Sequence, residues 1–305
     1  MKVDVALPCA PSLVHSKIND YLQLARPRLA LLVLVTVGAG WIVAAEGETQ
    51  ASSLVHALVG TAMLFAGAST FNQLLERHHD ALMPRTANRP LPAGRLQPGE
   101  ALALASTLSA GGLAYLLAFC QPLAAALGAF ALFSYVLVYT PLKERTPLST
   151  LVGAVPGAVP PLIGWTVARG NLGRGALALS LIVFLWQVPH FLAIAWIYRG
   201  QYARAGFRVL PVLDPHGVQP GRQMIRYTVA LIFASLMPSV LGFGGWLSAM
   251  SAVVLGAFFL HSEFVFARTG ATHQARQVLR MSLIFLPAQF LFLVLDALSE
   301  RMIGY

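Results

Sequence analysis

Long apolar stretches separated by shorter polar segments dominate the chain. Each stretch is long enough to cross about 30 Å of hydrocarbon as a single helix. Nine of them occur, at residues 28–45, 53–75, 101–119, 123–140, 149–168, 177–198, 226–245, 247–266 and 280–298. We therefore expect an all-α, polytopic membrane protein with about nine transmembrane helices.

A polar segment, residues 1–27, precedes the membrane domain, which we place at residues 28–299. The segment contains Asp4 and Asp20 and lacks the apolar core of a signal peptide. Its last part, Lys17 to Arg28, predicts an amphipathic helix that lies at the membrane interface. We expect the whole segment to lie in the cytoplasm.

The composition supports a membrane protein and excludes several other classes. Hydrophobic residues make up 57% of the chain and charged residues only 11%, with a mean hydropathy of +0.68. Soluble domains carry about 25% charged residues, so a water-soluble protein of this size could not cover its surface with so few charges. The same values exclude a disordered chain, a coiled coil, a collagen and a disulfide scaffold.

The net charge of +9 and the isoelectric point near 10.1 raise the question of nucleic-acid binding. The positions of the charges answer it. If the N-terminus lies inside, all but three of the 21 Lys and Arg residues fall on the inner side, the exceptions being Arg169, Arg174 and Arg301. This distribution follows the positive-inside rule and predicts an inner N-terminus and an outer C-terminus. The basic excess therefore reflects topology, and we expect no nucleic-acid partner.

The first group of polar residues lies at the inner end of the second span. Asn72, Glu76 and Asp80 are four residues apart, which places them on one stripe of a helix. Carboxylate and amide oxygens are ligands that Mg²⁺ takes while it shares phosphate oxygens with a substrate. Arg85 and Arg89 follow, and guanidinium groups bind phosphate through paired hydrogen bonds. The alternative is a solvated loop whose arginines serve topology and lipid headgroups.

The second group lies at the inner end of the fourth span. Lys143 and Arg145 could bind an anion, and Tyr139 adds a phenol at the interface. On this segment alone, an aromatic belt with a positive flank explains the residues better. The next span contains GAVPGAVPPLIGW at 153–165, whose prolines and glycines predict a broken helix. Irregular backbone at membrane depth must be buried or line a cavity, so we interpret this segment as a cavity wall.

The third group lies within the sixth span. His190 is eight residues from the predicted inner end, roughly 12 Å deep at about 1.5 Å per residue, and Gln187 shares its helix face. Polar side chains in lipid face the protein interior and indicate function, although an interhelical hydrogen bond is the alternative. The polar pattern continues past the helix with Tyr198, Gln201 and Tyr202.

These groups fall within sequence blocks that resemble the UbiA-type intramembrane prenyltransferase superfamily, and within it the branch that farnesylates haem. The blocks are NQLLERHHDALMPRTANRPLPAGR at 72–95, YTPLKERTP at 139–147, WQVPHFLAIAWIYRGQYARAGFRVLPV at 186–212 and ARQVLRMSLIFLP at 275–287. The resemblance covers about residues 20–295. It implies a nine-helix bundle around a central cavity. It also implies transfer of farnesyl from farnesyl diphosphate to a vinyl group of haem b, with water addition, giving haem O.

The resemblance also assigns residues. It implies Asn72, Glu76 and Asp80 as catalytic ligands of Mg²⁺, His190 as a further catalytic residue, and Arg85, Arg89, Lys143 and Arg145 as diphosphate contacts. A second site would comprise Tyr139, Gln187, Tyr198, Gln201 and Tyr202. Gln201 stands where the family usually has an acid, which weakens the case for a second metal. Whether Asp214 replaces that acid stays open.

The resemblance implies the inner membrane of a bacterium, with an active site that faces the cytoplasm. The implied partners are farnesyl diphosphate, haem b, the lipid bilayer, and a haem A synthase or cytochrome oxidase assembly factors. Three alternatives stay open: a prenyltransferase for another acceptor such as a quinone precursor, a transporter, and a non-catalytic haem-handling protein. The WQVPHF block argues against a quinone precursor. Carboxylates at the inner surface and short outer loops argue against a transporter.

Overall fold

The computed structural model describes residues 17–45 and 50–303, and within these ranges every regular element is a helix. Nine spans there are long and apolar enough to cross a membrane, which confirms the expected number. In chain order they are α1 (Lys17–Ala25) with α2 (Pro27–Ala44), α3 (Ala51–Leu75), α5 (Pro98–Phe119), α6 (Pro122–Phe133) with α7 (Thr140–Leu142), α8 (Ser149–Gly157) with α9 (Pro160–Arg169), α10 (Arg174–Ile197), α13 (Val218–Val240), α14 (Trp246–Thr269) and α15 (Thr272–Ile303).

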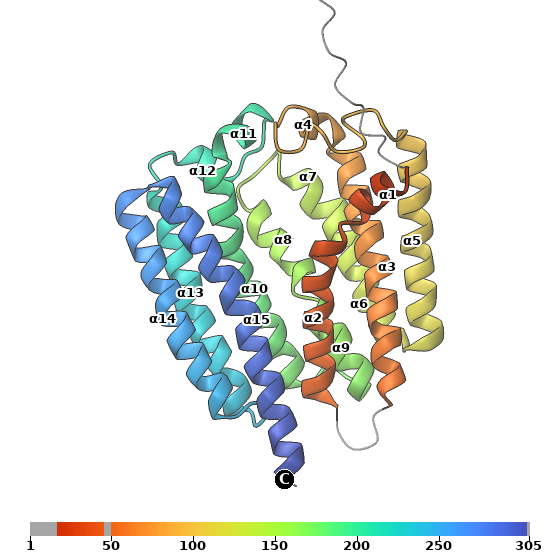
Figure 1. The fold of residues 1–305 in the computed structure, drawn as a ribbon, viewed down its shortest axis with the longest axis vertical. Coiled ribbons are helices and arrows are strands. Elements are labelled where there is room, and N and C mark those ends of the chain that lie inside the picture. Colours follow the sequence, from red (N-terminus) through yellow and green to blue (C-terminus); the bar gives the residue numbers. More distant parts are fainter. Residues whose placement is uncertain (1–16, 46–49, 304–305) are drawn as a thin grey trace, which may run out of the picture.

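Three short helices occupy the two long polar loops. They are α4 (Arg77–Ala81), α11 (Arg199–Arg204) and α12 (Leu210–Leu213). Figure 1 shows them together with α7 at one end of the bundle, which we call the loop end, whereas α15 finishes at the opposite end. The two loops that the sequence singles out therefore meet over the same end of the helices.

Two helices are longer than their apolar stretches. We expected the seventh and ninth spans to begin at residues 226 and 280, but α13 and α15 each begin about two turns earlier. The added turns contain arginines such as Arg222 and Arg276. Long basic side chains extend toward the polar interface, so a helix can begin before the apolar stretch does.

The expected N-terminal helix is present as α1, and hydrogen bonds and an ion pair attach it to the bundle. The hydroxyl of Ser69 and the side-chain amide of Gln73, both on α3, donate to the carbonyl oxygen of Leu24. Asp20 is buried and accepts from Arg95 Nε at 2.8 Å. This contact links α1 to the loop after α3. Residues 1–16 of the expected cytoplasmic segment lie outside the described ranges.

The proline-rich span is broken as expected. α8 ends at Gly157 and α9 begins at Pro160, so the helix is interrupted within the span at residues 158–159. The ring of Pro160 occupies the first turn of α9, where its missing N–H costs no helical hydrogen bond.

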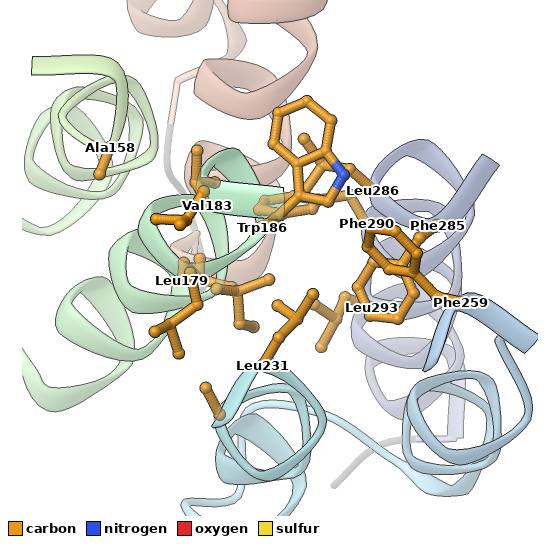
Figure 2. Close-up of a cluster of buried hydrophobic side chains, with 14 of the residues drawn as sticks. Ala158, Leu179, Val183, Trp186, Leu231, Phe259, Phe285, Leu286, Phe290 and Leu293 are labelled. Atoms are coloured by element: carbon orange, nitrogen blue, oxygen red, sulfur yellow. The ribbon is translucent and has the colours of Figure 1, made fainter. Parts of the chain in front are cut away.

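A buried apolar cluster fixes α10 against the C-terminal helices. Figure 2 shows Trp186 and Leu179 of α10 on one side of this cluster, with Phe259 of α14 and Phe285 and Phe290 of α15 opposite. Phe259 and Phe285 are fully buried. Burial of an aromatic side chain contributes roughly 1.5–3 kcal/mol in water-based measurements, although close packing is the larger factor between helices in lipid. The cluster therefore sets which face of α10 points to the centre of the bundle.

α2 and α9 approach each other closely at two glycines. A Cβ atom added to Gly164 would overlap the carbonyl oxygen of Val37, and one added to Gly40 would overlap that of Pro161. Small residues allow this approach between membrane helices. By contrast, a Cβ atom added to Gly38, also on α2, would have no atom within 4 Å beyond its own chain neighbours and helix backbone.

We predict that Gly164→Ala lowers the free energy of unfolding by about 1–3 kcal/mol, because the added methyl group forces the two backbones apart. Gly38→Ala is the matched control and should leave the stability unchanged or raise it by at most about 1 kcal/mol, since Ala favours helix over Gly. Thermal unfolding of the purified protein in detergent measures both variants. Equal melting temperatures for the two would contradict the close packing of α2 and α9.

Candidate active site

A cavity of about 590 Å³ extends from the loop end into the bundle. Its upper part is polar and is lined by the expected residues Asn72, Glu76 and Asp80 together with basic side chains. Its lower part is apolar and reaches the broken span, where Gly157 and Ile163 form part of the wall. The proline-rich segment thus lines a cavity, as predicted.

The first acidic group keeps its helical spacing across the join of α3 and α4. Glu76 lies between the two helices, yet its N–H donates to Asn72 at 2.9 Å, and the N–H of Asp80 donates to Glu76 at 2.8 Å. The stripe predicted for Asn72, Glu76 and Asp80 is therefore present. All three side chains are buried, with Asp80 only 1% exposed.

Each carboxylate forms a close ion pair with a cation from the predicted set. Lys143 Nζ lies 2.6 Å from Glu76 Oε1, and Arg89 lies 2.6 Å from Asp80 Oδ2. The amide of Asn72 donates to the hydroxyl of Thr140 at 3.2 Å. The structure thus brings together groups that are far apart in the sequence.

For each of these charged groups, burial favours the neutral form, whereas the oppositely charged partner favours the charged form, and the pKa reflects both effects. Burial raises the pKa of Asp80, while Arg89 acts against that rise. Burial and the nearby Arg26 lower the pKa of Arg89, and Asp80 opposes them. Burial disfavours the charged form of Lys143, but the Glu76 carboxylate and the tyrosines nearby outweigh it and raise the pKa of Lys143 above its ordinary value. Lys143 is therefore a firmly charged cation at the cavity.

The acidic group fits a metal ion that a substrate helps to hold. Asp80 Oδ1 is buried and has no hydrogen-bond partner. Within the described ranges, no three His, Cys, Asp or Glu side chains lie close enough to hold a metal by themselves. Two carboxylates and one amide match the partial set that Mg²⁺ takes when water and phosphate oxygens complete its shell.

Arg85 connects the two long loops above the cavity. Its guanidinium lies 4.5 Å from the centre of the Tyr198 ring and donates to the Tyr202 hydroxyl at 3.3 Å. Arg85 and Tyr202 line the cavity, and Tyr198 supports the arginine from outside it. Tyr139 also lines the cavity, and its ring lies 4.5 Å from Lys143 Nζ.

Three expected residues do not line the cavity, namely Arg145, Gln201 and Tyr198, which is described above. Arg145 is exposed and is not part of the lining, although Lys143 two residues before it is. Gln201 also lies outside the lining, and its Oε1 is buried without a hydrogen-bond partner. Asp214 has a structural role, because its carboxylate accepts from the backbone N–H groups of His216 and Gln219 at the start of α13. Asp214 also lies outside the cavity lining.

The deep polar residues line the cavity but differ in their contacts. Gln187 donates to the carbonyl oxygen of Ala154 on α8 at 3.2 Å, and its side chain fills the space beside Gly157. This is the interhelical hydrogen bond that we considered as the alternative. His190 is partly exposed in the cavity, and its ring is stacked on Trp186 with centroids 4.6 Å apart.

Arg26 is a cavity residue that the sequence analysis did not identify. It joins α1 to α2 with a φ of 49°, the single positive value at a non-glycine residue in the described part of the chain. Its side chain lines the cavity. A basic residue directly before Pro27, at the entrance to the first span, was the available signal.

Comparison with known proteins gives consistent matches over most of the chain. Residues 33–286 match the UbiA prenyltransferase family. A protoheme IX farnesyltransferase from Solibacter usitatus is 43% identical over 290 residues, covering 91% of this chain and 98% of the relative. One from Myxococcus xanthus is also 43% identical, covering 93% of this chain and 96% of the relative.

Solved structures of low sequence identity share the fold. A digeranylgeranylglyceryl phosphate synthase superposes with a TM-score of 0.78 at 16% identity, covering 93% of this chain and 99% of that one. A UbiA homologue from Archaeoglobus fulgidus bound to DMAPP and Mg²⁺ superposes with a TM-score of 0.66 at 15% identity, covering 90% and 99%.

Lys143 lines the cavity and Arg145 does not, so the two residues together test whether the cavity binds diphosphate. We predict that Lys143→Met weakens binding of inorganic diphosphate in the presence of Mg²⁺ by about tenfold or more, since it removes a charge-assisted contact. Arg145→Met should change the affinity less than about twofold, because the exposed side chain lies outside the lining. Calorimetry on purified protein measures both affinities, and the melting temperature of each variant reports folding. Equal losses in the two variants would contradict the arrangement.

Proposed function

The chain belongs to the UbiA prenyltransferase family, and from this premise we propose that it transfers farnesyl from farnesyl diphosphate to a vinyl group of haem b. Water addition then gives haem O. One structural observation carries the proposal: buried carboxylates paired with Lys143 and Arg89 lie at the top of an apolar cavity that also holds a histidine. The acceptor follows from the protoheme IX farnesyltransferases, which are 43% identical over nearly their whole length.

The first chemical step is cleavage of the allylic C–O bond. The electron pair leaves with the diphosphate, so catalysis mainly requires stabilisation of the negative charge that develops there. Lys143, Arg85 and Arg89 line the cavity and would bind the phosphate oxygens. Mg²⁺ held by Asn72, Glu76 and Asp80 would supply further positive charge to the leaving group.

The ion pairs prepare these residues for the substrate. In the absence of a diphosphate, Glu76 and Asp80 neutralise the same cations that the diphosphate would bind. When a diphosphate substrate arrives with Mg²⁺, the metal ion becomes the partner of the carboxylates and the diphosphate becomes the partner of the cations. Each charge then keeps a partner in both states, which limits the cost of burying it.

The second step joins the two substrates. The π electrons of the haem vinyl group attack C1 of the farnesyl cation and form a C–C bond. The positive charge moves to the carbon next to the porphyrin ring, where water adds and loses a proton. Early water would convert the farnesyl cation to farnesol, so an apolar wall is required. Trp186 and Phe191 contribute aromatic faces that stabilise a cation.

We also propose the orientation and the cellular setting. The loop end faces the cytoplasm of a bacterial inner membrane, with the N-terminus inside and the C-terminus outside. The distribution of Lys and Arg supports this orientation. Farnesyl diphosphate, which is charged and soluble, would then reach the cavity from the cytoplasm. The haem O product would pass to a haem A synthase or to cytochrome oxidase assembly factors.

The reaction can be tested directly with membranes that contain the protein. Farnesyl diphosphate, haem b and Mg²⁺ are added, and the porphyrins are analysed by mass spectrometry. We expect a product heavier than haem b by one farnesyl group and one hydroxyl group, and we expect a chelator to abolish it. A parallel reaction contains a phenolic quinone precursor in place of haem. Prenylation of the phenol, with no change to haem, would contradict the proposal.

The acidic residues provide the second prediction on the reaction. Asp80→Ala and Glu76→Gln should each lower the rate of transfer by about 10²–10³, the range seen when one group that stabilises developing charge is lost. Glu76→Asp keeps a carboxylate and should retain most of the activity. Size-exclusion profiles check that the variants are folded. Near-normal rates for Asp80→Ala or Glu76→Gln would exclude a role in holding Mg²⁺.

Arg89 provides a third prediction on the reaction. Arg89→Lys preserves the charge, but a single ammonium group cannot form two parallel hydrogen bonds with phosphate. We expect the KM for farnesyl diphosphate to rise about tenfold and kcat/KM to fall at least as far. Arg204→Lys, at an exposed position outside the cavity lining, is the control and should behave as wild type. Unchanged kinetics in Arg89→Lys would leave Arg89 with a role in topology alone.

A further inference from the structure

His190 lies on α10 in the wall of the cavity, one turn nearer the loop end than Gln187. It precedes the end of α10 by about 10 Å at the rise of an α-helix. Trp186 is stacked on one face of the imidazole with an interplanar angle of 23°, which limits how the ring can turn. Within the described residues, Nε2 has no hydrogen-bond partner, whereas Nδ1 has one.

That partner is Ser282 of α15, which is fully buried. Its Oγ lies 2.8 Å from His190 Nδ1 and 2.7 Å from the carbonyl oxygen of Leu279. A hydroxyl group has one hydrogen, and a carbonyl oxygen can only accept. When Ser282 donates to Leu279, the hydrogen between Ser282 and His190 must therefore come from Nδ1.

Trp186 strengthens the same arrangement. Its Nε1 donates to the backbone carbonyl oxygen of Ser282 at 2.7 Å, so the indole that is stacked on His190 is also attached to the serine. Two contacts with one residue of α15 thus fix both the position and the plane of the imidazole. Partners of this kind select the tautomer of metal-binding histidines and orient their rings.

We infer that Ser282 is a positioning residue that holds His190 in the Nδ1–H form, so that Nε2 presents its lone pair to the cavity as a ligand for haem iron. The inference rests on the proposed function in one respect, because it requires that the cavity binds haem b. A neutral imidazole with a free nitrogen is a common axial ligand of haem. An Fe–N bond at this depth would hold the porphyrin in the cavity beneath the diphosphate.

The opposite tautomer makes a different prediction. If Ser282 donated to Nδ1, Nε2 would carry a hydrogen and could only donate to an acceptor such as a haem propionate. That form cannot bind iron. The protonation of the two nitrogens in the protein without ligand therefore decides between the two arrangements.

Solid-state ¹⁵N NMR of the protein with labelled histidine measures the tautomer without any substrate. The His190 signals are identified by their loss in His190→Gln. We expect a protonated Nδ1 and an unprotonated Nε2. A protonated Nε2 with a bare Nδ1 would overturn the inference, and it would do so whether or not the protein farnesylates haem.

Binding of ferric protohaem to the purified protein provides the second readout. The absorption and EPR spectra of wild type should show a nitrogen ligand to iron, which His190→Gly loses and added imidazole restores. Ser282→Ala should weaken haem binding by about 10–100-fold, the usual effect of removing the partner of a ligating histidine. Ser282→Thr keeps the hydroxyl and should restore the wild-type spectrum.

Ser262→Ala is the matched control. Ser262 is also buried and donates to a carbonyl oxygen three residues earlier, that of Phe259, but within the described residues no hydrogen bond joins it to a histidine ring. Its substitution should leave the haem spectrum unchanged. Equal effects of Ser282→Ala and Ser262→Ala, or a wild-type spectrum in His190→Gln, would overturn the inference. If haem binds with a nitrogen ligand but is not farnesylated, the proposed function fails and the role of Ser282 stands.

Discussion

The structure depends on the need to pair every charge that is buried beside the membrane. An isolated ionised side chain in a medium of low dielectric is costly, and removal of one member of a buried pair leaves the other uncompensated. The Glu76–Lys143 and Asp80–Arg89 pairs meet this requirement. They also join the end of α3 to the end of the fourth span and to the loop after α4. The same contacts that stabilise the loop end therefore concentrate the charges needed for chemistry on a diphosphate.

The rest of the cavity follows from apolar packing around this charged end. The aromatic cluster between α10 and the C-terminal helices directs Trp186, Gln187 and His190 toward the centre of the bundle. The broken span packs beside α10, and its residues Gly157, Pro160 and Ile163 line the cavity. A polar upper part and an apolar lower part suit an amphiphilic substrate, with its diphosphate above and its isoprenoid chain below. The division also keeps water away from a reactive cation.

Much of this could be predicted from the sequence because the determining forces act locally. Apolar length defines the nine spans, and a four-residue spacing defines the stripe of Asn72, Glu76 and Asp80. The prolines of the fifth span predict its break. The sequence does not show which basic residue of the fourth span's inner end reaches the cavity. Lys143 and Arg145 are only two residues apart, and the local turn directs one into the lining and the other to the surface. Nor does it reveal Ser282, whose importance arises from its contact with a histidine 92 residues away.

The central claim is that the Glu76–Lys143 pair serves the reaction and not only the fold. A double variant, Glu76→Gln with Lys143→Met, removes both charges and leaves neither unpaired. Replacement of a buried ion pair by neutral residues is often harmless to stability. The decisive measurement is the rate of farnesyl transfer by this variant, taken on protein whose melting temperature is close to that of wild type. The account predicts a loss of at least about 10²-fold. A rate near that of wild type would contradict it.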